Sequence, residues 1–410
     1  MSNSTRIKFL VLLFITISII TFFVSNRSIG FKPKLVVSQV CEGSVSKQSI
    51  TPLKNTKHFL VSAYMDQRVQ GFDLRLIGMF RRDSIQELHC FFCCAGYTSE
   101  TTPAKILQHS DNFGFPFVTT DVLCQIPKTC KAAHVTLLTQ TRPENGTEYV
   151  WLPIGNKKTD GGEEKRMDFT VLLGVNRVVI YNTSCGPDLD RLLQGYSQEG
   201  FVEIVSWPLD KYMNPSTDWI FSSRGGDIHY FGQLTTLNEC IYRSMERSRY
   251  VLLNDIDEII MPYQHDNLTS LMDELQKQHP EVGVFLIENH YFPKHHFEPS
   301  GRFHLPRWSK VPGINILEHI YREDPDRNSY HPHKMIIQPR MVEQTSVHEV
   351  LRSFGQKYKV PLEVCRIIHI RDAIRKSLKL EELNVDNRLW DFQEKLIPNV
   401  DKVLKNLGFI

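Results

Sequence analysis

Three carboxylates within four residues are the strongest candidate for chemistry in this sequence. Asp255, Asp257 and Glu258 follow an apolar run, residues 250–253, whose length and composition predict a buried strand. In an extended segment Asp255 and Asp257 project from the same face, where their charges repel each other. A divalent cation would offset this repulsion, and oxygen ligands of this kind suit magnesium or manganese. The alternative is a solvated acidic turn at the end of a strand.

The elements around these carboxylates predict an α/β fold. Residues 148–154, 177–181 and 202–207 have the composition of strands, and helical patterns lie between them. Residues 232–247 carry an apolar stripe at helical spacing and end just before the acidic stretch. Strands that alternate with helices predict a mainly parallel sheet flanked by helices, and such sheets bind ligands beyond the carboxyl ends of their strands. The two aspartates would therefore lie at the ligand-binding edge.

Changes in amino-acid composition along the 410 residues predict five segments. They are a cytosolic tail (1–8), a transmembrane signal anchor (9–25), a stem (26–57), a small β-rich module (58–144) and the α/β domain (145–410). In the β-rich module, short apolar or alternating runs are separated by turn residues, as in an antiparallel sheet. The module has no convergent acid–base set, so we expect it to be structural or to shape the acceptor site.

The N-terminal region and the cysteines indicate a membrane-anchored, lumenal protein. Residues 9–24 are uncharged and almost wholly apolar, close to the minimum length for a membrane span; a cleaved signal peptide is the alternative, but no small-residue cleavage site follows. By the positive-inside rule, the lysines and arginines on either side of the span would instead place the part of the chain after the span in the cytosol. Sequons at Asn145, Asn182 and Asn267 favour the lumen. The nine cysteines also suit an oxidising compartment, where pairs among those from Cys90 to Cys130 could cross-link the β-rich module. The net charge of +2 gives no reason to expect nucleic acid.

Several segments of the chain carry a recognisable pattern: residues 62–68, 177–184, 232–243, 250–262, 334–339 with 347–348, and 368–371. Together they are similar to glycosyltransferase family 92, and the first of them resembles its animal, nematode-like members. The resemblance implies a GT-A fold and a Golgi type II membrane enzyme. It further implies transfer of a hexose, galactose in characterised members, from a UDP-sugar donor to a glycan acceptor, with inversion and usually with Mn²⁺.

That chemistry assigns roles to residues far apart in the chain. A divalent ion on the diphosphate neutralises the charge of the leaving group. We predict Asp257 as its direct ligand, Asp255 as a ligand through water or as a partner of the donor ribose, and His348 as the third ligand. Lys334 would place a positive charge on the phosphates. An ordinary histidine and a solvated surface lysine are the alternatives for the last two.

An inverting transfer also needs a general base that takes the proton of the acceptor hydroxyl. This base should lie opposite the leaving group, away from the carboxylates that hold the metal. Glu288, which follows an apolar strand at 282–287, is our first candidate, and Glu318 is the second.

Further polar and aromatic residues could line the substrates. Tyr181, Asn182 and Ser184 end a strand at the predicted nucleotide edge and could form the uridine pocket, in which case the sequon at Asn182 is unused. Four aromatic residues could stack on sugar faces or could equally belong to the core: Trp219, Tyr291, Phe292 and Trp308.

Three other functions are open from the sequence. The chain could be an inactive lumenal glycan-binding or scaffold protein of the same fold, although such a protein has no use for a costly carboxylate pair. It could be a metal-dependent transferase with another sugar-nucleotide donor. A phosphatase that uses Asp255 and Asp257 as nucleophile and acid is the third, but the residues after Glu258 do not give the usual turn.

Overall fold

The computed structural model describes residues 41, 43–95, 97–144, 146–157, 172–328, 330–373, 375 and 378–410. The predicted tail, the predicted anchor and half of the predicted stem (26–40 and 42) lie outside these residues. Within the described ranges, none of the helices combines the length and the apolar character needed to cross a membrane.

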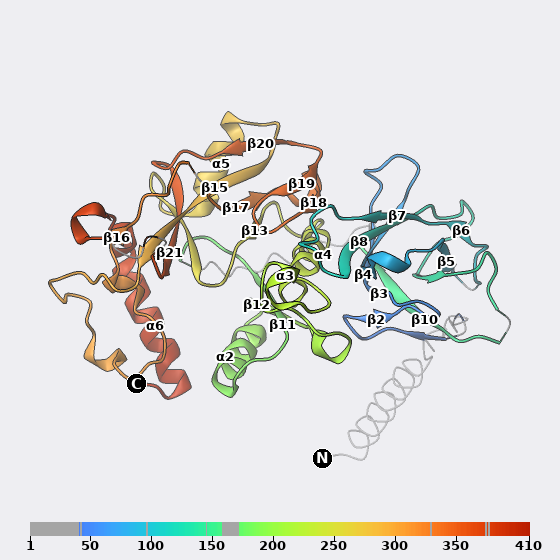
Figure 1. Cartoon of the computed structure of the whole chain (residues 1–410), viewed down its shortest axis with the longest axis horizontal. Helices are drawn as coiled ribbons and strands as arrows, with labels where there is room; N and C mark the ends of the chain where they lie inside the picture. Colours follow the sequence, from blue (N-terminus) through green and yellow to red (C-terminus); the bar gives the residue numbers. More distant parts are fainter. Residues whose placement is uncertain are drawn as a thin grey trace, which may run out of the picture.

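The described chain up to Gly155 forms a ten-stranded sheet, at the right of Figure 1. Its main path runs β6-β5-β9-β10-β3-β4-β8-β7, with β1 beside β10 and β2 beside β3. Most neighbours are antiparallel, whereas β10 pairs in parallel with β1 and β3. The strands are β1 (Gly43–Val45), β2 (Thr51–Pro52), β3 (Phe59–Met65), β4 (Leu74–Arg81), β5 (His89–Cys93), β6 (Thr102–Pro103), β7 (Lys105–Gln108), β8 (Phe117–Cys124), β9 (His134–Leu138) and β10 (Tyr149–Gly155).

Three disulfides cross-link this sheet and its loops. Two of them, Cys90–Cys124 and Cys94–Cys130, join cysteines of the region where the sequence suggested pairing, and the third is Cys41–Cys93. They lie within apolar clusters that also contain side chains of β4, β8, β9 and β10. Such cross-links fit an oxidising compartment.

The remaining described chain forms a six-stranded mixed sheet, three two-stranded sheets and several helices. The elements are β11 (Val178–Asn182), α2 (Pro187–Gln198), β12 (Val202–Ser206), α3 (Phe221–Arg224), α4 (Gln233–Ser244), β13 (Val251–Leu253), β14 (Glu258–Pro262), α5 (Leu268–Gln278), β15 (Val282–Pro293), β16 (Tyr321–Arg322), β17 (His333–Ile337), β18 (Val342–Thr345), β19 (Val350–Ser353), β20 (Gln356–Lys359), β21 (Cys365–Arg371), β22 (Asn384–Val385) and α6 (Gln393–Leu407). The six-stranded sheet has the order β13-β17-β15-β21-β14, with β20 also beside β15.

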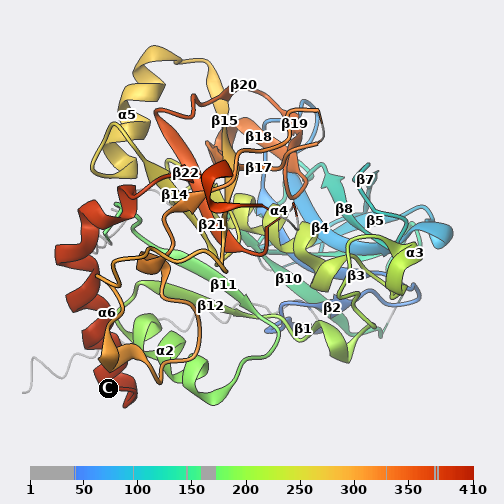
Figure 2. The ribbon, with the colours of Figure 1, turned by 60° about the vertical axis from the view of Figure 1, so that its left-hand side comes forward.

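The prediction of a mainly parallel sheet is wrong, although the mixed α/β class is confirmed. In the six-stranded sheet β13–β17, β17–β15 and β14–β21 are antiparallel, and only the pairs β15–β21 and β15–β20 are parallel. The parallel pair β11–β12 forms a sheet of its own, and α2 packs on it beside α6 (Figure 2). Strands and helices alternate only up to α5. The strands after α5 follow one another without the crossover helices that consecutive parallel strands need. Most pairs in the six-stranded sheet are therefore antiparallel.

Helix α4 lies between the two large sheets (Figure 1). Its buried face includes Ile241 and Tyr242, which pack with Tyr64 and Ile77 of the ten-stranded sheet and with residues of the six-stranded sheet such as Met335. An apolar stripe at helical spacing predicted this helix, and the structure confirms it. The helix therefore contributes to the core on both sides.

A buried arginine joins the ten-stranded sheet to the later part of the chain. The guanidinium of Arg75, on β4, is fully buried and lies 2.9 Å from Asp66, 2.5 Å from Asp121 and 2.8 Å from Glu343 on β18. Burial alone would raise the pKa of Asp121, but His109 and the Arg75 guanidinium outweigh it and hold that pKa at about 2. The junction is therefore a compensated cluster of charges.

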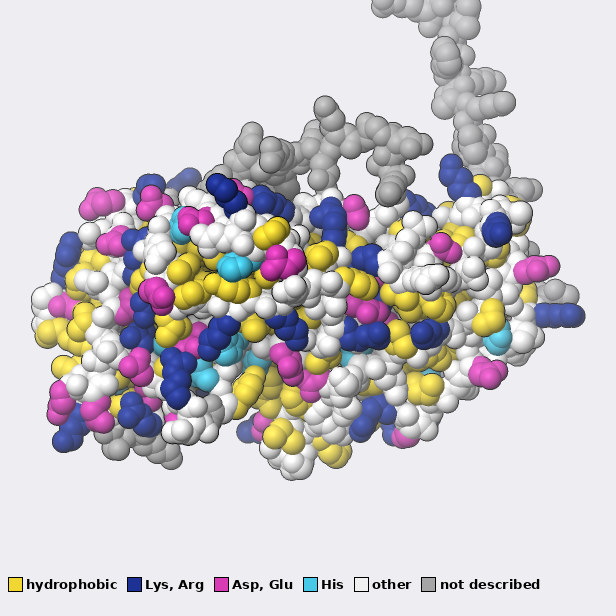
Figure 3. All heavy atoms as spheres, turned by 90° about the horizontal axis from the view of Figure 1, so that it is seen from above, with side chains coloured by type: hydrophobic (Ala, Val, Ile, Leu, Met, Phe, Trp, Pro, Cys, Tyr) yellow, Lys and Arg dark blue, Asp and Glu magenta, His cyan; other side chains and the backbone are white. Residues whose placement is uncertain are grey.

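Basic and acidic side chains are interspersed over the face seen from above (Figure 3). The prediction that the chain has no nucleic-acid partner rests on its near-zero net charge, and it stays a prediction.

Candidate active site

The two aspartates lie on a tight turn between β13 and β14. The side-chain amide of Asn254 donates to the carbonyl oxygens of Asp255 and Glu258, both at 3.1 Å. The backbone N–H of Asp255 donates to the Glu258 carboxylate at 3.0 Å, and the Glu258 N–H donates back to the Asp255 carbonyl at 3.2 Å. These reciprocal bonds fix the turn. They leave the side chains of Asp255 and Asp257 37% and 64% exposed, respectively.

Lys334 lies beneath this turn and contacts two of the carboxylates. It sits on β17, directly opposite Ile287 of the neighbouring strand β15, and its side chain is 1% exposed. Its Nζ is 2.9 Å from Asp255 Oδ2 and 3.6 Å from Glu258 Oε2. A buried ammonium is tolerated only with such compensation. The alternative of a solvated surface lysine is therefore excluded, and Lys334 belongs to the cluster around Asp255.

Glu258 is a buried member of the cluster. Burial raises the pKa of Glu258 to about 7, against the opposing effect of the Lys334 ammonium. The Asn289 amide donates to Glu258 Oε1 at 2.8 Å and to His369 Nδ1 at 3.2 Å. Glu258 thus helps to orient Asn289 and the backbone of the turn.

His369 and Asn289 are the site residues that sequence reasoning did not assign. His369 lies opposite Glu258 in the β14–β21 register, and its Nε2–H donates to Asp257 Oδ2 at 3.3 Å. The signal for His369 was its place in the family-like segment 368–371. Asn289 carried no comparable signal.

His348 is held in the tautomer that carries its proton on Nδ1 and its lone pair on Nε2. Because a carbonyl only accepts, Nδ1 must carry the proton in its 3.1 Å bond to the His333 carbonyl. Burial, together with the Lys334 ammonium, lowers the pKa of His348 to about 4, so the ring is neutral at pH 7. The lone pair of Nε2 is then available. Histidine ligands of metals commonly donate their other N–H to a backbone carbonyl in this way.

The described residues contain no group of three His, Cys, Asp or Glu side chains that converge on one metal position. Asp255, Asp257 and His348 therefore do not form a closed three-ligand cage. A cation of the Mg²⁺ type is usually held by one or two carboxylates and completed by substrate phosphates. The open aspartate pair fits that arrangement. Gln233 places a further oxygen next to this pair. Its Nε2 donates to Asp255 Oδ1 at 3.2 Å, and its buried Oε1 has no partner in the described structure.

The structure places Glu288 in a different cluster. Glu288 and Asn289 are consecutive in β15 and point to opposite faces. The Glu288 carboxylate lies 3.2 Å from His290 and 2.9 Å from both Arg327 and Lys359. Burial would raise the pKa of Glu288, but these three partners outweigh it and hold the pKa far below the usual range. Such a carboxylate is a weak base.

The second candidate base also lies elsewhere. Glu318 ends a short helical turn and contacts His304 at 2.9 Å. It is not brought next to Asp255 by any contact of the described residues.

The residues predicted for the uridine pocket have separate positions. The Tyr181 hydroxyl donates to Glu239 on α4, a carboxylate that also accepts from Tyr64 and pairs with Arg243. This hydroxyl is thus engaged inside the fold. The Asn182 amide donates to the Cys185 sulfur at 3.5 Å, and Ser184 is exposed just beyond the end of β11.

Two of the four candidate stacking residues lie beside the site. The Trp219 ring stacks on His348, and Tyr291 meets His369 edge-on at 5.6 Å. Phe292 is buried in the core, and the Trp308 Nε1–H donates to Asp401 on α6 at 2.7 Å. The last two therefore serve the fold.

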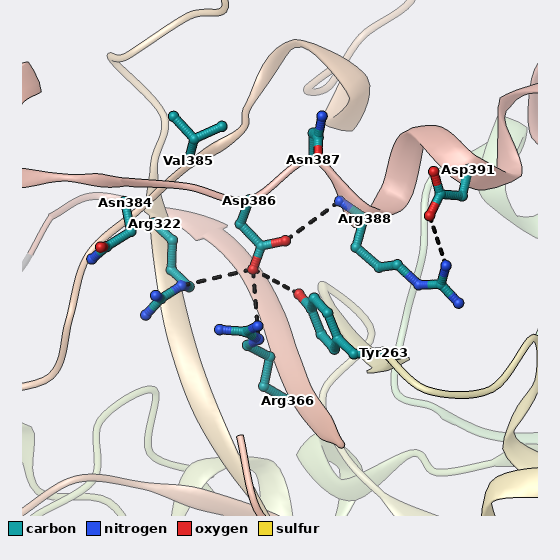
Figure 4. A pocket seen from close by; sticks show the side chains of 9 residues that line it. All are labelled: Tyr263, Arg322, Arg366, Asn384, Val385, Asp386, Asn387, Arg388 and Asp391. Atoms are coloured by element: carbon teal, nitrogen blue, oxygen red, sulfur yellow. Dashed lines mark hydrogen bonds and ion pairs between the residues drawn. The ribbon is translucent and has the colours of Figure 1, made fainter. Parts of the chain in front are cut away.

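A cavity of about 440 Å³ lies at the other end of β14 from Glu258 (Figure 4). Its lining residues are Tyr263, Arg322, Arg366, Asn384, Val385, Asp386, Asn387, Arg388 and Asp391. Asp386 accepts from the Tyr263 hydroxyl at 2.7 Å and faces Arg322 and Arg366 at 3.7 and 3.6 Å. Arg388 pairs with Asp391 at 2.6 Å. The charges compensate one another and fix the segment before α6, so we place the chemistry at Asp255.

Two comparisons with known proteins assign the chain to a family. A family model described as glycosyltransferase family 92 matches residues 167–406. A glycosyltransferase family 92 protein from Caenorhabditis elegans is 23% identical over 192 residues, which are 47% of this chain and 35% of that protein. The chain thus spans about a third of the length of this curated relative. The family model covers more than half of the chain, including the Asp255 turn, Lys334, His348 and His369. The chain therefore belongs to glycosyltransferase family 92, and this membership indicates a glycosyltransferase.

Proposed function

We propose that this protein transfers a hexose, with galactose as the first choice, from a UDP-sugar to a glycan acceptor with inversion. We place it in the Golgi as a type II membrane enzyme that uses Mn²⁺. The observation that carries the proposal is the fixed turn of Asp255 and Asp257, exposed to solvent above the buried ammonium of Lys334. A negative pair next to a positive charge suits a diphosphate and its counter-ion.

Each residue of the cluster has a task in this proposal. Asp257 and Asp255 would hold Mn²⁺, which when bound neutralises charge on the UDP leaving group. Lys334 orients Asp255 through their 2.9 Å ion pair and adds positive charge near the phosphates. His348 offers a neutral Nε2 lone pair, and His369 orients Asp257 through its 3.3 Å hydrogen bond. Tyr181, Asn182 and Ser184 remain our proposal for the nucleotide edge.

We expect removal of divalent cations to lower transfer by about a hundredfold or more, because the leaving group would lose its Lewis acid. The measurement is a screen of UDP-sugars with the purified protein, with and without a chelator. Added Mn²⁺ should restore the rate. Full transfer in the presence of the chelator would contradict the metal assignment.

One observation favours the alternative of an inactive glycan-binding or scaffold protein of the same fold. The Lys334 ammonium already compensates the charge of Asp255, so that carboxylate does not need a cation for this purpose. Binding of UDP that tightens with Mn²⁺, without hydrolysis or transfer of any UDP-sugar, would establish this alternative.

We expect Glu288→Gln to act on stability more than on chemistry. Its carboxylate balances Arg327 and Lys359, so the neutral amide should lower the free energy of unfolding by about 1–2 kcal/mol. Thermal unfolding and kcat should be measured on the same preparation. If kcat instead falls by about 10²–10⁴ with unchanged unfolding, Glu288 is the general base, as the sequence suggested.

A further inference from the structure

The backbone just before α4 is strained and presents two aromatic side chains to solvent. Tyr230, Phe231 and Gly232 have φ values of 29°, 55° and 73°, the left-handed region that bulky residues rarely adopt. Each such non-glycine residue costs about 1–3 kcal/mol. The Trp207 Nε1–H holds the segment by donating to the Phe231 carbonyl at 3.0 Å. Despite this anchoring, Tyr230 and Phe231 stay 38% and 39% exposed.

The exposed rings continue into a connected surface. The Tyr230 ring stacks on Trp219, with centroids 5.8 Å apart and planes 22° apart. Trp219 in turn stacks on His348 at 5.5 Å and 15°. Tyr330, which is 77% exposed, meets the His348 ring at 6.5 Å. We call these residues, Trp219, Tyr230, Phe231, Tyr330 and His348, the aromatic shelf.

The aromatic shelf adjoins the Asp255 turn along two separate chain segments. Gln233 follows the strained segment directly, and its amide donates to Asp255. His348 bonds to the carbonyl of His333, the residue next to Lys334, which pairs with Asp255. Rings that are distant in sequence therefore meet at the edge of the proposed donor site.

We propose that the aromatic shelf binds a pyranose ring of the acceptor glycan by stacking against the apolar C–H face of the sugar. The inference rests on the proposed function, because it names the acceptor side of the same site. Three of its rings, Tyr230, Phe231 and Tyr330, are exposed to solvent and offer apolar area to a sugar ring. Backbone strain of this kind persists where the position of a side chain has a use.

The direct test replaces shelf residues in the full-length protein and separates the two substrates. Trp219→Ala and Tyr230→Ala should each raise KM for the acceptor about tenfold, assayed against a panel of released glycoprotein glycans. For Tyr230→Ala, whose ring stacks on Trp219 rather than on His348, KM for the UDP-sugar and the rate of donor hydrolysis without acceptor should change less than twofold. Trp219→Phe should keep most of the acceptor affinity. An unchanged acceptor KM overturns the proposal. An equal loss of UDP binding would assign the rings to the nucleotide instead.

A binding assay keeps this test independent of turnover. Titration of the same glycan panel without UDP should change the tryptophan fluorescence of the wild type, and Trp219→Phe should remove that change. Trp308→Phe, which alters a ring bonded to Asp401, is the matched control and should retain it. If no UDP-sugar is turned over but the fluorescence change depends on Trp219, the proposed transfer fails and the aromatic shelf stands. No change with any glycan in the wild type overturns the shelf.

Discussion

Asp257→Asn should lower transfer by about a hundredfold or more without changing the fold. The asparagine keeps the shape of the side chain and can still accept from His369, but it loses the charge that the proposed cation requires. Asp257 is 64% exposed, so no buried charge is left without a partner. The expected result is therefore a loss of kcat/KM with an unchanged Tm.

The matched control for this variant is Asp210→Asn, an exposed aspartate in a short helical turn after β12. It removes the same charge from the surface, and we expect wild-type transfer. Both variants should be compared at saturating Mn²⁺ by initial rates and by thermal unfolding. Wild-type turnover of Asp257→Asn under these conditions would refute its role at the diphosphate.

Arg75→Met should lower the free energy of unfolding by about 3–5 kcal/mol. The methionine fills part of the volume, but three carboxylates, Asp66, Asp121 and Glu343, would stay buried without their shared guanidinium. Because Glu343 comes from β18, we also expect weaker coupling between the ten-stranded sheet and the part of the chain that follows it. Denaturant unfolding should then show a lower midpoint, or two transitions in place of one.

Arg81→Met is the control, because Arg81 pairs with Asp83 at the surface and its loss should leave unfolding unchanged. A wild-type midpoint for Arg75→Met would show that the buried junction contributes nothing to stability.

The same junction predicts a dependence on pH. The folded pKa of Asp121 is about 2, below its ordinary value near 4. Its contribution to stability is therefore complete above pH 4 and is lost as the pH falls through about 2. As the pH is lowered from 5 to 2, the unfolding midpoint of Asp121→Asn should fall less steeply than that of the wild type. Equal slopes would contradict the assignment.

Local patterns in the sequence predicted the elements next to the chemistry but not their partners. The stripe of α4 and the apolar run before Asp255 depend on neighbouring residues only, and both elements form as expected. Lys334 lies about 80 residues further on, and only the β13–β17–β15 register brings it under Asp255. That register is a property of the whole sheet.

Glu288 shows a second limit of sequence reasoning. Strand β15 is buried on both faces, so its sequence carries no alternation that tells which side faces the site. Asn289 faces Glu258, and Glu288 therefore points the other way. The residue of β15 that faces the site is therefore the neighbour of the predicted base.

The position of α4 has a consequence for how this protein can be shortened. The family model begins at residue 167, yet Ile241 and Tyr242 of α4 pack with Tyr64 and Ile77, which come from much earlier in the chain. A truncation at the family boundary would expose that apolar face and leave Glu343 without Arg75. The smallest autonomous folding unit with the Asp255 turn thus includes the ten-stranded sheet, and expression trials should begin upstream of β1.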